Sequence, residues 1–128
     1  MPKYVLIGLC EPVDESGEAA FDEWFIQQHI EDTARCPNFV SGKVFALRAP
    51  HLDIETATRY LSLYEVEADS HEEAERVLNE WQADADAWPG RAAHNATRQR
   101  FGQLPMKIGG SGWYELLRAY DGNGERTD

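Results

Sequence analysis

The stretch "KYVLIGLCE" (Lys3–Glu11) decides the fold, because it is apolar on both sides of a predicted β-strand. Side chains alternate between the two faces of a strand. One face carries Val5, Ile7 and Leu9, and the other carries Tyr4, Leu6 and Cys10. A strand with two apolar faces is covered from both sides, so we expect this one at the centre of a sheet.

Outward from this strand, capping signals and hydrophobic periodicity predict two helices and three further strands. The first helix runs from a cap at Ser16 to about Arg35, and the second from a cap at Ser70 to about Ala87. The further strands are expected at residues 38–49, 59–68 and 112–120. The order βαββαβ is that of a ferredoxin-like α+β fold with one antiparallel sheet.

The length of 128 residues suits a single domain. We expect this domain at 1–120, with an extra loop or helix at 87–111 and a flexible tail at 121–128. Two helices cover only one face of a four-stranded sheet, yet the strands are apolar on both faces. In the last strand the two faces carry Trp113 and Leu117, and Tyr114, Leu116 and Tyr120. We therefore predict an obligate homodimer in which two sheets pack face to face.

The composition limits the partners and the compartment. With 12 Lys and Arg against 23 Asp and Glu, the formal net charge is −11, which opposes binding to nucleic acid or to an anionic membrane. No apolar run approaches the roughly 20 residues that span a bilayer, so we expect a soluble, cytoplasmic protein. Cys10 and Cys36 have no CxxC spacing and are expected as free thiols, with a disulfide as the alternative. The histidines show no metal-ligand spacing, and no metal or cofactor is expected.

The first helix contains "FDEWFIQQHIED" (residues 21–32), whose apolar stripe is interrupted by polar residues. At about 100° per residue, Gln28 and Asp32 fall inside the stripe and His29 falls on its border. Burial of an amide and a carboxylate is costly unless they are hydrogen-bonded or face a solvated cavity. We expect a cavity between this helix and the sheet. The alternative is that Asp32 and Gln28 bond to nearby backbone and loop groups.

The second helix is a control for the first. Its predicted apolar face contains no polar residue and consists of Ala74, Val77, Leu78, Trp81, Ala85 and Trp88. In the first helix, Asp32 follows His29 by three residues and is placed to hold one ring nitrogen, leaving the other toward a pocket. This arrangement orients an imidazole as a general base. The alternative is that His29 is a surface or structural residue.

A family resemblance starts from the same helix. The pattern is carried by Phe21, Trp24, Phe25, His29, Ile30, Asp32, Pro37, Phe39, Phe45, Tyr60 and Tyr64. In these residues the chain resembles the EthD-like branch of the dimeric α+β barrel superfamily, from about Tyr4 to Leu78. The resemblance implies a homodimer with a pocket between sheet and helices. Relatives include muconolactone isomerases, polyketide cyclases and dehydratases, and haem or quinol monooxygenases. It also implies metal-free proton transfer, with His29 as the position that carries over.

From these observations we predict a cofactor-independent lyase or isomerase acting on a small aromatic or cyclic substrate. Three catalytic residues are predicted. His29 transfers the proton, Asp32 orients the His29 ring, and Tyr64 stabilises an oxyanion. The predicted pocket residues are Trp24, Phe25, Gln28, Tyr60 and Trp88. The alternatives are a non-catalytic binder of small molecules, and a quinol or haem monooxygenase.

The segment 87–114 contains no Asp or Glu. If "RAAHNATRQR" is helical, Arg91, His94 and Arg98 share one face by their spacing. These residues would then bind a carboxylate or phosphate of the substrate. The alternative is that they pair with the acidic surface. The stretch "GQLPMKIGGSG" (102–112) is predicted to be a flexible loop or lid.

Overall fold

A computed structural model describes residues 1–52, 58–100 and 107–128, except for the side chains of His94 and residues 97–100. Four strands form one sheet: β1 (Lys3–Glu11), β2 (Phe39–Ala46), β3 (Tyr60–Glu67) and β4 (Lys107–Glu115). The helical segments are η1 (Glu15–Gly17), α1 (Glu18–Phe21), η2 (Asp22–His29), α2 (Ile30–Ala34), α3 (His71–Ala83) and α4 (Arg91–Arg100). In the described residues, no helix is long and apolar enough to cross a membrane.

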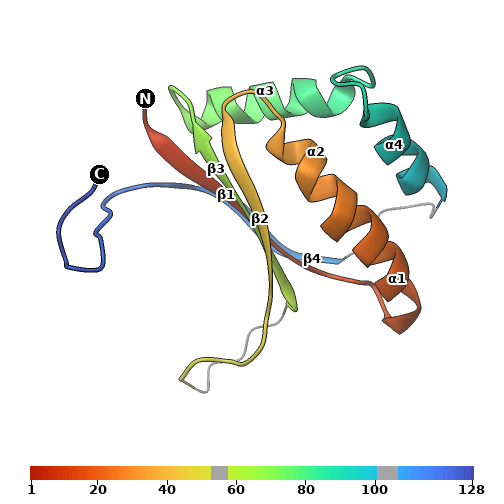
Figure 1. The fold of residues 1–128 in the computed structure, drawn as a ribbon, viewed down its shortest axis with the longest axis horizontal. Helices are drawn as coiled ribbons and strands as arrows, with labels where there is room; N and C mark the ends of the chain where they lie inside the picture. The colour runs from red at the N-terminus through yellow and green to blue at the C-terminus, as the bar shows by residue number, and fades with distance from the viewer. Residues whose placement is uncertain (53–57, 101–106) are drawn as a thin grey trace.

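The sheet has the strand order β2-β3-β1-β4, and every neighbouring pair is antiparallel. β1 lies between β3 and β4, so that Leu6 has Tyr64 opposite it on one side and Trp113 on the other. The helices cover one face of the sheet (Figure 1). The ferredoxin-like α+β fold and the inner position of the first strand are thus confirmed.

The first helix is continuous in sequence but changes its hydrogen-bonding pattern along its length. It is capped by Asp14, whose carboxylate accepts from the Gly17 N–H at 3.1 Å, so the prediction of Ser16 as the cap is wrong. Its middle segment, η2, is a π-helix, at whose end the Ile30 N–H donates to the Phe25 carbonyl five residues back.

The second helix begins as predicted, because the Ser70 hydroxyl accepts from the Glu73 N–H at 3.1 Å. It ends at Ala83, four residues before the predicted end at Ala87. Residues 84–90 then lead into α4, so the "RAAHNATRQR" stretch, for which the sequence left loop and helix open, is helical.

The last strand lies earlier in the chain than the predicted range of 112–120. The stretch 107–112, predicted as part of a flexible loop or lid, is paired with β1; that prediction is wrong for these residues, and 102–106 lie outside the described residues. A Cβ at Gly109 would lie 2.5 Å from Cγ2 of Thr58, so close approach explains this glycine better than hinge freedom. Leu116, Leu117 and Tyr120 lie beyond β4.

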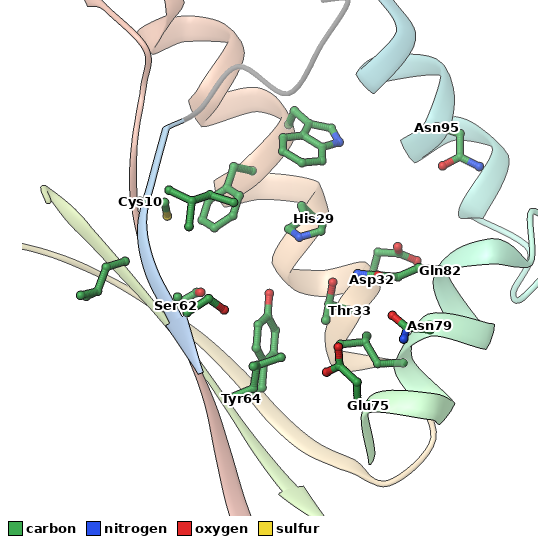
Figure 2. Close-up of a pocket in the computed structure, with 18 of the residues that line it drawn as sticks. Cys10, His29, Asp32, Thr33, Ser62, Tyr64, Glu75, Asn79, Gln82 and Asn95 are labelled. Atoms are coloured by element: carbon green, nitrogen blue, oxygen red, sulfur yellow. The ribbon is translucent and has the colours of Figure 1, made fainter. Parts of the chain in front are cut away.

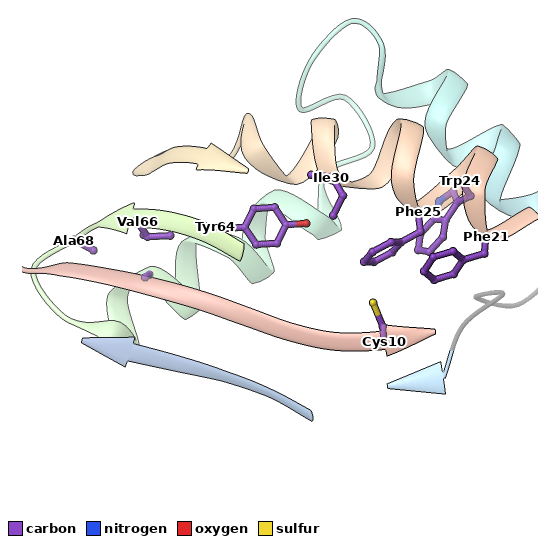
Figure 3. Close-up of a cluster of buried hydrophobic side chains, with 9 residues drawn as sticks. Cys10, Phe21, Trp24, Phe25, Ile30, Tyr64, Val66 and Ala68 are labelled. Atoms are coloured by element: carbon purple, nitrogen blue, oxygen red, sulfur yellow. The ribbon is translucent and has the colours of Figure 1, made fainter. Parts of the chain in front are cut away.

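The core lies between the sheet and the first helix. Its buried members come from β1, the first helix, β3 and the start of α3, and include Cys10, Phe21, Trp24, Phe25, Tyr64 and Val66 (Figure 3). Phe21 stacks on Phe25 with ring centroids 4.9 Å apart and packs against Tyr60 at 5.0 Å. These contacts fix the first helix on the sheet. They thereby also set the position of His29, one turn after Phe25.

On the opposite face of the sheet, the described part of the chain places no helix (Figure 1). Alternation from the helix-facing Ser62 and Tyr64 assigns Leu61 and Leu63 of β3 to this open face. Ile7 lies opposite Leu63, and Phe45 lies opposite Leu61. Phe45 is 50% exposed and Tyr114 is 59% exposed.

The chain ends in a hydrogen-bonded turn. The Asp121 carboxylate accepts from the N–H groups of Asn123 at 2.8 Å and Glu125 at 3.0 Å. Gly124 adopts a positive φ of 78°, which favours glycine. These bonds give a defined turn to the tail that the sequence predicts as flexible.

Candidate functional site

A cavity of about 420 Å³ lies between the helix-covered face of the sheet and the helices. From the sheet it is lined by Leu6, Cys10, Ser62 and Tyr64; from the first helix, by Trp24, Phe25, His29, Asp32 and Thr33. The third wall comes from α3 and α4 (Figure 2). The expected cavity beside the polar positions of the first helix is therefore present.

The π-helical segment sets the position of His29. Its ring stacks on Trp24, five residues back, with centroids 4.6 Å apart, and on Phe25, four residues back, at 5.4 Å. In an α-helix, residues five apart point about 140° away from each other and do not stack. A hydrogen bond from the Gln27 amide to the Asp22 carboxylate joins another pair five apart on the exposed side. The wider turn therefore moves His29 from the border of the apolar stripe to the wall of the cavity.

Tyr64 reaches the cavity from the middle of β3. Its side chain is buried, and its hydroxyl points into the cavity toward the first helix (Figure 2). Among the described residues the hydroxyl has no partner at hydrogen-bond distance. Burial raises the pKa of the phenol well above its usual value, and the nearby Thr33 hydroxyl opposes this by less. Tyr64 is thus a neutral phenol at pH 7 with a hydrogen to donate.

Asp32 belongs to a buried polar cluster that joins three helices. Its carboxylate accepts a hydrogen bond from Trp88 Nε1 and forms an ion pair with Arg91 Nε at 3.4 Å. The Arg91 guanidinium also donates to the carbonyl oxygens of Trp81 and Gln82, both at 2.9 Å. These carbonyls end α3, so a positive charge caps that helix.

The predicted site residues separate into three groups. His29, Asp32, Tyr64, Trp24, Phe25 and Arg91 line the cavity together. Gln28, Tyr60 and Trp88 are described but do not line it: Tyr60 packs on Phe21, and the Trp88 ring lies under the Arg35 guanidinium at 4.0 Å. Gln28 is half-buried, and its Oε1 has no hydrogen-bond partner in the described part of the chain. The side chains of His94 and Arg98 lie outside the described atoms.

The sequence interpretation missed the polar wall of the cavity. This wall consists of Glu75, Asn79 and Gln82 from α3 and Asn95 from α4. Their side chains stand opposite the sheet in Figure 2. The sequence did contain a signal for this wall. Glu75, Asn79 and Gln82 are spaced by four and three residues, which places them in one row of the helix beside its apolar face.

Other reactive side chains of the site are few. The Cys10 thiol lines the cavity, but burial raises its pKa to about 11, so it is protonated and a poor nucleophile near neutral pH. In the described residues no three His, Cys, Asp or Glu side chains gather as a metal site requires.

Comparisons with known proteins identify the fold. No protein-family model matches the chain, and no curated protein matches it. Among solved structures, HapK from Hahella chejuensis is 12% identical with a TM-score of 0.55, covering 89% of this chain and 92% of its own. A "putative monooxygenase" from Shewanella loihica PV-4 is 14% identical with a TM-score of 0.51, covering 93% of this chain and 99% of its own.

A third structure is an ethyl tert-butyl ether d (ethd) family protein from Bacillus halodurans C-125. It is 17% identical with a TM-score of 0.49, and the match covers 91% of this chain and 100% of that protein. At these identities the likeness to HapK and the Shewanella protein establishes the shared α+β fold of this chain.

Proposed function

We propose that the cavity catalyses proton transfer on a small aromatic or cyclic substrate, as a cofactor-independent lyase or isomerase. The observation that carries this proposal is that the His29 imidazole and the buried Tyr64 hydroxyl line one cavity. An imidazole accepts a proton near neutral pH, and a neutral phenol donates a hydrogen bond to oxygen. Enolisation of a carbonyl compound needs both functions.

In the proposed step, a ring nitrogen of His29 takes a proton from the carbon beside a substrate carbonyl. The electron pair of that C–H bond forms the enolate double bond, and the negative charge develops on oxygen. The Tyr64 hydroxyl donates to this oxygen, and its raised pKa keeps the phenol protonated beforehand. The imidazolium then returns the proton to a second carbon in an isomerisation, or to a departing hydroxide in a dehydration.

The cavity walls support a ring-shaped substrate. Trp24, Phe25 and Leu6 give it apolar surface, and a volume of about 420 Å³ accommodates one or two fused rings. Asp32 lies one turn after His29, and its bonds to Trp88 and Arg91 support a structural role, in which it fixes this turn against α3 and α4. We propose that Asp32 positions His29 through this turn.

Hydrogen exchange on a simple enolisable ketone tests the proposal. Deuterium from D₂O should enter 2-tetralone faster in the presence of the protein, followed by ¹H NMR. His29→Ala should lower the catalysed rate by roughly 10² to 10⁴, and Tyr64→Phe by roughly 10² to 10³. His51→Ala and Tyr120→Phe, which change exposed residues outside the cavity, are the matched controls. Full activity of His29→Ala would refute the assigned base.

Assays on the same protein also distinguish the two alternative functions, a non-catalytic binder and a monooxygenase. A non-catalytic binder would take up 2-tetralone, detected by quenching of tryptophan fluorescence, without accelerating exchange. For a monooxygenase, which is how the Shewanella protein is described, turnover of a hydroquinone would stop when dioxygen is removed.

We further propose that the molecule is a homodimer whose open sheet faces pack together. Ile7, Leu61, Leu63 and Phe45 place apolar side chains on this face, in neighbouring registers. Contiguous exposed apolar surface of this kind is unusual in monomers. A second copy has the same surface and is self-complementary about a two-fold axis.

A further inference from the structure

The wall of the cavity formed by Glu75, Asn79, Gln82 and Asn95 has features that catalysis by His29 and Tyr64 does not use. Three of these residues share one row of α3, and Asn95 adds an amide from α4. Leu78 lies within the same stretch of α3 and is the apolar contribution of the helix to the cavity. The wall is thus dense in amide groups, unlike the aromatic wall around Trp24.

The amide side chains have unused hydrogen-bonding groups. Asn79 and Gln82 are exposed at the mouth of the cavity and Asn95 is half-buried, and in the described residues their amides have no hydrogen-bond partner from the protein, so water solvates them until a ligand replaces it. Each amide offers two N–H donors and a carbonyl acceptor. Hydroxyl and carbonyl groups of a ligand match such a set, because each forms a neutral hydrogen bond with one half of the amide.

The charges of the cavity disfavour an anion. Arg91 is the cation of the described lining, and it is held between the Asp32 carboxylate and two carbonyl oxygens. Glu75 adds a carboxylate, which accepts from Trp113 Nε1 at 2.7 Å. A ligand carboxylate at the amide wall would therefore lie beside the Glu75 carboxylate, and Arg91 would not be available to pair with the ligand.

We propose that this amide wall is the specificity determinant of the cavity. It selects neutral aromatic or cyclic ligands that carry several hydroxyl or carbonyl groups, and it rejects carboxylates of the same size. This inference rests on the proposed function only in placing the ligand in the same cavity, because recognition by the wall does not require proton transfer.

Binding of matched naphthalenes by isothermal titration calorimetry tests the wall. The probes are 1,3-dihydroxynaphthalene, 2-naphthoate and, as the apolar control, 2-methylnaphthalene. At pH 7.5 the dihydroxy compound should bind at least about tenfold more tightly than the carboxylate. Asn79→Leu and Gln82→Met, which keep the side-chain volume, should each weaken the dihydroxy compound by roughly fivefold, the equivalent of one neutral hydrogen bond. Neither change should weaken 2-methylnaphthalene.

A charge variant gives a second, independent readout. Glu75→Gln should improve binding of 2-naphthoate severalfold, whereas Glu72→Gln, on the same helix but outside the cavity lining, should leave it unchanged. Equal affinity for the carboxylate and the dihydroxy compound, or wild-type affinity in both amide variants, would overturn the inference. Failure of all three probes to bind would overturn it as well. Selective binding without deuterium exchange into 2-tetralone would refute only the proposed reaction.

Discussion

Replacement of Arg91 by methionine should destabilise the protein strongly. The side chain is 6% exposed and its partner Asp32 is 10% exposed, so the change leaves a buried carboxylate with no cation. Removal of one partner from a buried ion pair costs roughly 3–5 kcal/mol. The 3.4 Å separation favours the lower end, although two carbonyls at the end of α3 also lose their donor. At about 3–5 °C per kcal/mol for a chain of this size, the melting temperature should fall by roughly 10–15 °C.

Urea unfolding followed by tryptophan fluorescence measures this loss. Arg76→Met is the matched control, because Arg76 forms two shorter ion pairs, at 2.6 Å, with Glu73 and Glu80 in solvent. This control should change stability little. Combining Arg91→Met with Asp32→Asn should recover part of the loss, since no unpaired charge stays buried. If Arg91→Met costs no more than Arg76→Met, the buried cluster does not hold the three helices together.

Three further predictions concern the dimer, the stacked histidine and the thiols. Sedimentation equilibrium at micromolar concentration should give twice the 14.5 kDa chain mass, and Leu63→Asp should yield unfolded or aggregated chain where Val13→Asp does not; a stable wild-type monomer would contradict the proposed interface. Trp24→Leu should reduce the upfield ring-current shift of the His29 ring protons in ¹H–¹³C NMR spectra, leaving the part due to Phe25, and an unchanged spectrum would show that the Trp24 and His29 rings are not stacked. The pKa values of Cys10 and Cys36 are raised by burial to about 11 and about 12, whereas an unfolded thiol ionises near 9, so stability to urea should fall as pH rises from 9 to 11. Changing both cysteines to alanine should reduce that slope, and an unchanged slope would exclude the thiols as its cause.

The fold could be predicted because its signals are local and repeated. The doubly apolar β1 and the Ser70 cap each follow from a few neighbouring residues. The limits of β4 could not be predicted, since the glycines at 109–112 resemble a loop in sequence. Gly110 and Gly112 pair with β1, and Gly109 lies at the irregularity between Gly110 and Ile108, where a Cβ would meet Thr58, a residue far away in the chain.

The candidate site could be predicted only where its signal lies within one helix. The interrupted stripe of the first helix indicated a cavity beside Asp32, and the cavity is there. An α-helical wheel placed His29 only on the border, because the wheel assumes 3.6 residues per turn, whereas residues 22–29 form a wider π-helical turn that stacks His29 on Trp24 and Phe25. The ion pair of Asp32 with Arg91 joins residues 59 positions apart, a distance that periodicity within one helix does not reach.

The most direct test of the central claim is the stereochemistry with which deuterium enters 2-tetralone. A single base held on one wall of the cavity, such as His29, removes one of the two hydrogens on the reacting carbon in each binding event. Mass spectrometry of the early reaction should therefore show singly deuterated product that is enriched in one enantiomer by chiral analysis, and His29→Ala should remove this enrichment. A racemic product, or an enrichment that persists in His29→Ala, would contradict the assignment of His29 as the positioned base.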